Sequence, residues 1–148
     1  MPKVFTSKSQ KIGELGESIA CNYLKKQGFT LVERNATYKW GEIDIIAVKD
    51  KKLYFIEVKA VSVSSIDMQT GENETFTRGI RPEENLNPQK MQKLRRTIEL
   101  YLFHPPTEKL RVAGIKEIPV VWQFDLLCVY LDTQNKKAKV TVFPNVII

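Results

Sequence analysis

The residues best suited to chemistry lie in two consecutive runs of β-forming residues, 40–49 and 52–61, which only Asp50-Lys51 separates. A two-residue connection between two such runs predicts a tight antiparallel hairpin. Counting outward from this connection places Asp44 directly opposite Glu57. The predicted hairpin therefore brings two carboxylates together.

The same register places Glu42 opposite Lys59. Because side chains alternate between the two faces of a strand, this pair should share a face with the two opposed carboxylates. The apolar continuation of that face consists of Ile46, Val48, Leu53 and Phe55. The other face is almost wholly apolar and consists of Ile43, Ile45, Ala47, Tyr54, Ile56, Val58 and Ala60. Both faces are predicted to be partly buried, with the charges at the open end of one.

Opposed carboxylates repel each other and weaken strand pairing, and burial strengthens the repulsion. A divalent cation removes this conflict, and Mg²⁺ typically takes one or two carboxylates together with waters and phosphate oxygens. Lys59 would add positive charge beside such a metal and orient a water or a phosphate. Asp44, Glu57 and Lys59 thus suit phosphodiester hydrolysis. The alternative is structural: a cross-strand Glu42–Lys59 ion pair and two solvated carboxylates at strand ends.

A basic helix is predicted to begin at Asn87, with this residue as the N-cap and Pro88 in the first helical position. The apolar stripe of this helix consists of Met91, Leu94, Ile98, Tyr101 and Leu102, and its end is marked by His104-Pro105-Pro106. Its polar side carries Gln89, Lys90, Lys93, Arg96 and Thr97. A basic helix face beside a metal site could track a phosphate backbone. A solvated face without a ligand is the alternative.

The other elements complete a single domain of 148 residues in the order αβββαββ. A first helix is expected from about Ser9 to Gln27, with Ser7 and Gln10 at capping-box spacing and Gly28 at its end. Further strands are expected at 29–36, 120–131 and 139–148. Residues 62–87 show no clean period, which is typical of a lid, a binding loop or a disordered segment. A second irregular stretch precedes Pro119.

The composition fits a basic cytoplasmic protein. The net charge is +6 and the sequence pI is about 9.3, which favours a polyanionic partner such as nucleic acid. No apolar run approaches the roughly 20 residues of a membrane span, and residues 1–10 lack the apolar stretch of a signal peptide. Cys21 and Cys128 each follow an apolar pattern and are interpreted as reduced core residues.

An ordered series of motifs resembles the YraN-like proteins, a bacterial family similar to archaeal Holliday-junction resolvases within the PD-(D/E)xK nuclease superfamily. The series begins with Gly16-Glu17-Ser18-Ile19-Ala20 and Asn35, continues with Gly41-Glu42-Ile43-Asp44 and Phe55-Ile56-Glu57-Val58-Lys59, and ends with Lys90, Leu94 and Phe124-Asp125. The resemblance implies a restriction-endonuclease-like fold: a central mixed β-sheet flanked by helices.

Carried over by position, the resemblance implies that Asp44 and Glu57 bind the metal, with the backbone carbonyl of Val58 as a third ligand. Lys59 would be the catalytic lysine. Glu17 matches the acidic residue that resolvase-like proteins direct at the metal, with Glu14 as the competing choice. Gln89 occupies a position that often holds a Gln or Lys near the site, where Lys90 could serve instead.

The chain also departs from the family pattern. Thr37, Ala60 and Gln123 stand where the family often has arginines. Arg78 and Arg81 in the long irregular stretch are candidates to replace these lost phosphate contacts.

Together these observations predict a Mg²⁺- or Mn²⁺-dependent nuclease that hydrolyses DNA, with branched or junction DNA among the candidate substrates. The basic residues Lys90, Lys93 and Arg96 would contact the nucleic acid. The alternative is a nucleic-acid-binding module that keeps the fold without significant turnover. Resolvase relatives act as dimers, so a homodimer is one expected arrangement.

Overall fold

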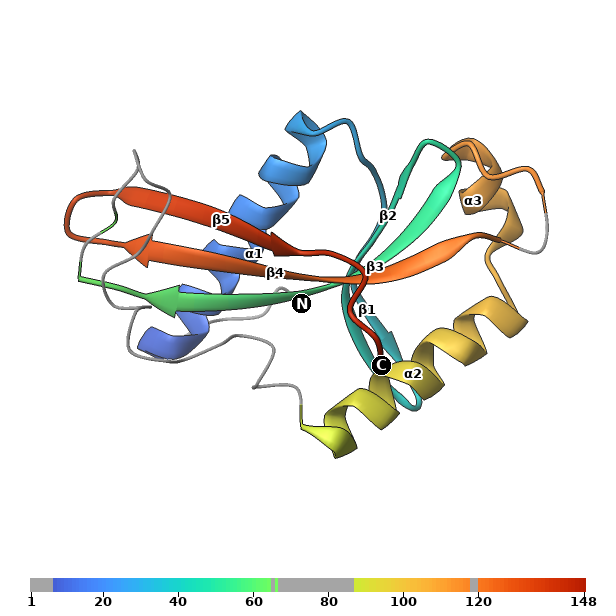
Figure 1. The fold of residues 1–148 in the computed structure, drawn as a ribbon, viewed down its shortest axis with the longest axis horizontal. Helices are drawn as coiled ribbons and strands as arrows, with labels where there is room; N and C mark the ends of the chain where they lie inside the picture. The colour runs from blue at the N-terminus through green and yellow to red at the C-terminus, as the bar shows by residue number, and fades with distance from the viewer. Residues whose placement is uncertain (1–6, 65, 67–86, 118–119) are drawn as a thin grey trace.

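A computed structural model describes residues 7–64, 66, 87–117 and 120–148. It is a five-stranded mixed sheet with helices on both faces (Figure 1). The elements are α1 (Lys8–Lys26), β1 (Thr30–Tyr38), β2 (Gly41–Lys49), β3 (Lys52–Ser62), α2 (Pro88–Phe103), α3 (Thr107–Val112), β4 (Trp122–Asp132) and β5 (Lys137–Phe143). Most of the predicted loop 62–87, with Arg78 and Arg81, lies outside the described residues.

The strands lie in the sheet in sequence order, β1 to β5. Strands β1, β2 and β3 form an antiparallel meander, β3 and β4 are parallel, and β4 and β5 are antiparallel. The one parallel pair needs a long crossover, which includes α2 and α3. This arrangement confirms the predicted mixed sheet and the order αβββαββ. The short helix α3, which falls in a stretch predicted to be irregular, is an addition.

The hairpin between β2 and β3 has the predicted turn. Asp50 and Lys51 adopt φ values of 50° and 63°, as a type I′ turn requires at both central residues. The strand pairs run from Lys49–Lys52 to Ile45–Ile56, which is the register predicted from the two-residue connection.

Both faces of the sheet are buried. Helix α1 covers one face, where Ala20, Cys21 and Leu24 pack on residues such as Ile45 and Ile56. Helices α2 and α3 cover the other face over Ile46, Leu53 and Phe55. Burial on both faces explains the nearly continuous apolar runs of the central strands. Both cysteines are buried, as predicted.

The helix starts follow the predicted capping chemistry. Ser7 accepts a hydrogen bond from the backbone N–H of Gln10 at 3.1 Å, and the Gln10 side chain accepts one from the backbone N–H of Ser7. Asn87 caps α2 by accepting a hydrogen bond from the backbone N–H of Lys90 at 2.8 Å. None of the helices described is long and apolar enough to cross a membrane.

The C-terminal segment differs from the prediction of a strand to Ile148. Strand β5 ends at Phe143, directly before Pro144, which has no N–H for the ladder. The backbone N–H of Val146 donates to the carbonyl of Phe124 at 2.8 Å, and Val146 and Ile148 pack on the core cluster that includes buried residues of α2. The C-terminus lies near α2 (Figure 1). The chain end is therefore a cover for the sheet rather than an edge strand.

Candidate metal centre

The candidate site lies where the hairpin opens. Within the described strands the β2–β3 ladder ends at Ile45–Ile56, although both strands continue. Beyond this pair β2 stays with β1, and β3 stays with β4. Asp44 and Glu57 are the first residues past the last pair, so they stand at the fork between two diverging strands.

Asp44 takes the place of a backbone acceptor at this fork. Its Oδ2 atom accepts a hydrogen bond from the backbone N–H of Val58 at 2.9 Å. In a β-strand the N–H and C=O of one residue point to the same side, so the Val58 carbonyl also faces the fork. This orientation is compatible with the predicted role of Val58 as a backbone ligand.

The side-chain alternation of β2 breaks at Asp44. Ile45 lies in the core under α1, but Ile43 lies in the core under α2. The prediction that these two residues share a face was therefore wrong. Asn35, which occupies the facing position of β1, has a left-handed φ of 53°. An irregular backbone on the neighbouring strand accompanies the change of face.

The carboxyl groups of Asp44 and Glu57 line the same cleft, and the side chain of Glu57 is only 15% exposed. Burial, followed by the charge of Asp44, raises the pKa of Glu57 to about 7. Burial also raises the pKa of Asp44, against the opposing effect of the Val58 N–H. The Nζ of Lys90 lies 3.2 Å from Oε1 of Glu57 and partly compensates the acidic pair. The predicted conflict between two buried carboxylates is present.

These carboxylates open into a cleft of about 350 Å³ between β2 and α2. The cleft is lined by Gly41, Glu42, Asp44, Glu57, Lys90, Lys93, Leu94 and Thr97. Its walls thus combine acidic side chains from the hairpin with basic side chains from the helix. A phosphate group near a carboxylate-bound cation would meet both kinds of charge here.

Helix α1 approaches the fork from the other face of the sheet. Gly16 lies so close to Ala60 of β3 that a Cβ atom at this position would clash with the alanine methyl group. The next residue, Glu17, is 13% exposed and accepts a hydrogen bond from Nε of Arg34 at 3.2 Å. Burial, with a smaller contribution from the charge of Asp44, raises the pKa of Glu17, while Arg34 opposes the rise.

Arg34 is thus a partner that sequence reasoning missed, because its contact with Glu17 depends on how α1 packs against β1. The same guanidinium lies 3.4 Å from Glu14, whose side chain is 41% exposed. Of the two competing acidic residues, Glu17 is the more buried and the one whose charge is coupled to Asp44.

Sequence comparison places the chain in a family. A sequence model of the uncharacterised protein family UPF0102 matches residues 16–129. The chain belongs to the UPF0102 family. A UPF0102 protein of Campylobacter lari is 41% identical over 121 residues, which cover 81% of this chain and 84% of the relative. A Campylobacter jejuni relative is 38% identical over the same shares. One from Helicobacter hepaticus is 39% identical over 95 residues, covering 64% of this chain and 72% of the relative.

The UPF0102 match contains every residue of the candidate site, from Gly16 and Glu17 to Lys90 and Lys93. Strand β5 and the residues that close over the core at the C-terminus follow it. The family match therefore spans the fork and both helices that approach it.

None of the three predicted catalytic residues of this UPF0102 protein lines the cleft, and Glu17 lies on α1. Lys59 is exposed and lies opposite Cys128 of β4, while Gln89 is exposed in the first turn of α2. The predicted Lys59–Glu42 pairing was wrong, because the ladder ends before it reaches these residues. Lys90, the named alternative to Gln89, is the helix residue in contact with Glu57.

Thr97 also differs from its predicted place on the polar side of α2. It is 1% exposed, and its hydroxyl donates to the carbonyl of Lys93 at 2.8 Å. A Cβ atom at Gly41 would lie 2.8 Å from this hydroxyl oxygen. The close approach fixes the start of β2 against α2 and so determines the width of the cleft.

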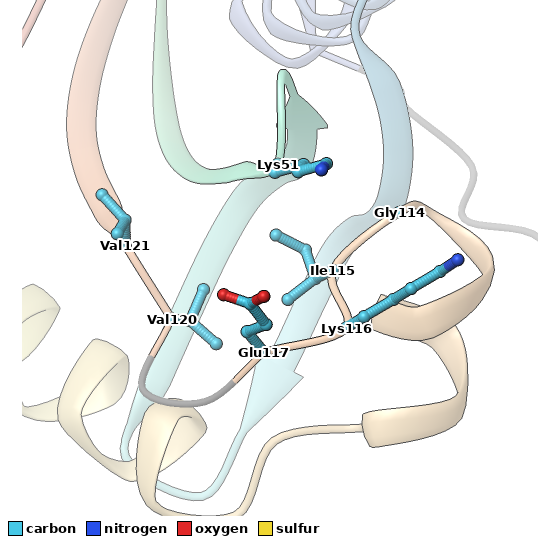
Figure 2. A pocket seen from close by; sticks show the side chains of 7 residues that line it. All are labelled: Lys51, Gly114, Ile115, Lys116, Glu117, Val120 and Val121. Carbon is cyan, nitrogen blue, oxygen red and sulfur yellow. The ribbon is translucent and has the colours of Figure 1, made fainter.

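A second hollow, of about 380 Å³, lies at the other end of β3 beside the hairpin turn (Figure 2). Its lining includes the aliphatic side chains of Ile115, Val120 and Val121, together with Glu117. No group of three or more His, Cys, Asp or Glu side chains is gathered anywhere in the described part of the chain. A metal centre would therefore need the paired carboxylates of the fork, completed by a backbone carbonyl and waters.

Proposed function

We propose that this UPF0102 protein is a divalent-metal-dependent nuclease of the PD-(D/E)xK type that hydrolyses DNA phosphodiesters. One observation carries the proposal: Asp44 and Glu57 lie side by side at the fork of the sheet and line one cleft with the basic side chains of α2. A purely structural role gives no reason to hold two carboxylates together in a mostly buried place.

The donor set fits a hard cation. Asp44, Glu57 and the carbonyl of Val58 offer oxygen atoms only, which is what Mg²⁺ and Mn²⁺ prefer, and waters can complete the coordination. When bound, the metal would lower the pKa of a coordinated water and stabilise the negative charge that develops at phosphorus.

The chain's own residues would bind and orient the substrate. Lys90 and Lys93 line the cleft, and Arg96 follows one turn further along α2, so the helix offers a row of cations to successive phosphates. Lys90 forms an ion pair with Glu57. A cation bound at the carboxylates would weaken this ion pair and leave the ammonium group of Lys90 available to a phosphate. Glu17, on the α1 side of the sheet, would add negative charge near Asp44 and so favour a cation at the acidic pair.

The nucleic-acid-binding module remains a second candidate because Lys59, the predicted catalytic lysine, is exposed and outside the cleft lining. In this alternative α2 binds a phosphate backbone without turnover. The two functions share the binding surface and differ in whether metal promotes cleavage.

The test combines metal binding with cleavage. Titration calorimetry with Mn²⁺ should show one site in the wild type and none in Asp44→Asn or Glu57→Gln. Glu108→Gln, which removes an exposed carboxylate on α3, is the matched control and should bind as the wild type does.

Metal-dependent cleavage is then measured on linear duplex, single strand, flap and four-way junction DNA. Activity that needs the metal and disappears in both cleft variants and in Lys59→Ala supports the nuclease. Metal-independent DNA binding without cleavage would replace it with the binding module, and the absence of both would remove the proposal.

A further inference from the structure

Beside the carboxylate cleft lies a third hollow, whose exposed tryptophan has no role in the function proposed above. Its volume is about 340 Å³, and its lining consists of Lys39, Trp40, Gln92, Lys93 and Arg96. Trp40 lies in the turn between β1 and β2, and its side chain is 46% exposed. We call these five residues the Trp40 notch. An exposed tryptophan surrounded by cations is a combination that a folded core does not require.

The cations are arranged around the indole ring. Lys39 Nζ lies 5.3 Å from the ring centroid, and the guanidinium carbon of Arg96 lies 5.8 Å from it. Both distances are within the range of cation–π attraction. The ring is therefore oriented by its neighbours while nearly half of its surface remains open to solvent.

The backbone beneath the ring is also fixed. Gly41, the residue after Trp40, approaches the buried Thr97 of α2 so closely that a Cβ atom would not fit. The turn is thereby held against the helix, and Trp40 is held beside Arg96. A platform positioned in this way loses little conformational freedom when a flat ligand stacks on it.

The Trp40 notch is continuous with the carboxylate cleft through Lys93, which lines both. Lys90, Lys93 and Arg96 follow at intervals of three residues on one side of α2. Their spacing covers about 9 Å along the helix axis, which corresponds to two or three nucleotides of a stacked strand at about 3.4 Å each. A strand with one phosphate at the carboxylates would present a base near Trp40.

We propose that the Trp40 notch binds an unpaired base of a single-stranded nucleic acid segment, with Lys93 and Arg96 on the adjoining phosphates. Stacking on an aromatic side chain requires an open base face, which a paired and stacked duplex offers only at its ends. Resting on the proposed nuclease function, this defines the substrate class: nucleic acid with an unpaired stretch beside the cleaved bond.

Binding is measured without metal so that it does not depend on cleavage. The anisotropy of a labelled oligo-dT in EDTA is compared with that of a duplex of equal length. Trp40→Ala should weaken single-strand affinity roughly 5- to 100-fold and duplex affinity much less, while Trp40→Phe should retain most of the affinity. Phe103→Ala, which removes a more exposed aromatic side chain at the end of α2, should leave both affinities unchanged.

A charge-matched pair tests the notch independently of Trp40. Arg96→Gln and Arg95→Gln remove the same charge from neighbouring positions of α2, but Arg95 is paired with Glu99 and does not line the notch. Arg96→Gln should weaken single-strand binding several-fold more than Arg95→Gln. Equal losses in the two variants, or equal losses of single strand and duplex in Trp40→Ala, would overturn the proposal.

The two proposals fail separately. Single-strand binding that depends on Trp40, in a protein that never cleaves DNA, would keep the notch and reject the nuclease. Metal-dependent cleavage in a protein whose Trp40→Ala variant binds single strands normally would do the reverse.

Discussion

Replacing Glu57 with Gln should remove much of the pH dependence of folding in the metal-free protein. Burial and the charge of Asp44 raise the pKa of Glu57 from 4.5 to about 7. Between these pH values the folded protein retains a proton that the unfolded chain has lost. The free energy of unfolding of the wild type should therefore fall as the pH rises from 4.5 to about 7.

The magnitude follows from the pKa. A rise from 4.5 to about 7 corresponds to about 3 kcal/mol, which belongs to the coupled Asp44–Glu57 pair rather than to either residue alone. The favourable effect of Lys90 on the charged carboxylate is already contained in this pKa. Glu57→Gln should thus match the wild type near pH 4.5 and exceed its stability by about 3 kcal/mol near pH 8.

Urea denaturation in EDTA across this pH range measures the difference. Glu99→Gln, which removes an exposed carboxylate paired with Arg95 on α2, is the control and should follow the wild type. Mg²⁺ at about ten times its dissociation constant should then add about 1.4 kcal/mol to the wild type near pH 8 and nothing to Glu57→Gln. A wild-type stability that is flat or rises between pH 4.5 and 7, relative to the variant, would refute the reasoning.

Three further substitutions test the packing that positions the site. Gly16→Ala should lower the free energy of unfolding by about 1–3 kcal/mol, because α1 must move away from β3. Gly13→Ala, which lies in open space on the same helix, is the control and should raise the free energy of unfolding by about 0.5–1 kcal/mol. Thermal denaturation compares the two variants, and equal effects would contradict the close contact. Gly41→Ala should lower the free energy of unfolding by about 1–3 kcal/mol, because its Cβ atom would clash with the Thr97 hydroxyl. A variant as stable as the wild type would contradict this close contact. Asn87→Ala should cost about 0.5–2 kcal/mol through the lost N-cap, measured by urea denaturation; Asn87→Asp, which can still cap, should stay close to the wild type.

Most of the fold could be predicted from local signals. The turn at Asp50-Lys51, the caps at Ser7 and Asn87 and the register of the hairpin each depend on residues only a few positions apart. Helix α3 and the end of β5 were not predicted. An apolar C-terminal run is compatible both with a strand and with a segment that covers the core. In the structure this segment covers the core, and the backbone N–H of Val146 donates to the carbonyl of Phe124.

The candidate site could be predicted in part. The hairpin arithmetic placed Asp44 and Glu57 together, but it assumed that the ladder continues to Glu42 and Lys59. The structure ends the ladder at Ile45–Ile56, which separates those two residues and lets Asp44 accept the Val58 N–H. The metal-binding and catalytic roles of these residues stay predictions.

By itself, the sequence determined which residues pair next to the hairpin turn, where the two long helices begin and which strands are buried on both faces. These properties depend on turn chemistry, capping and hydrophobic period, all of which act over short stretches of chain. Only the tertiary structure decided that Lys90 meets Glu57, that Arg34 holds Glu17 and that Trp40 stands beside Arg96. Each of these contacts joins elements whose relative position is set by how helices and strands pack around a shared core, and a local pattern carries no information about that position.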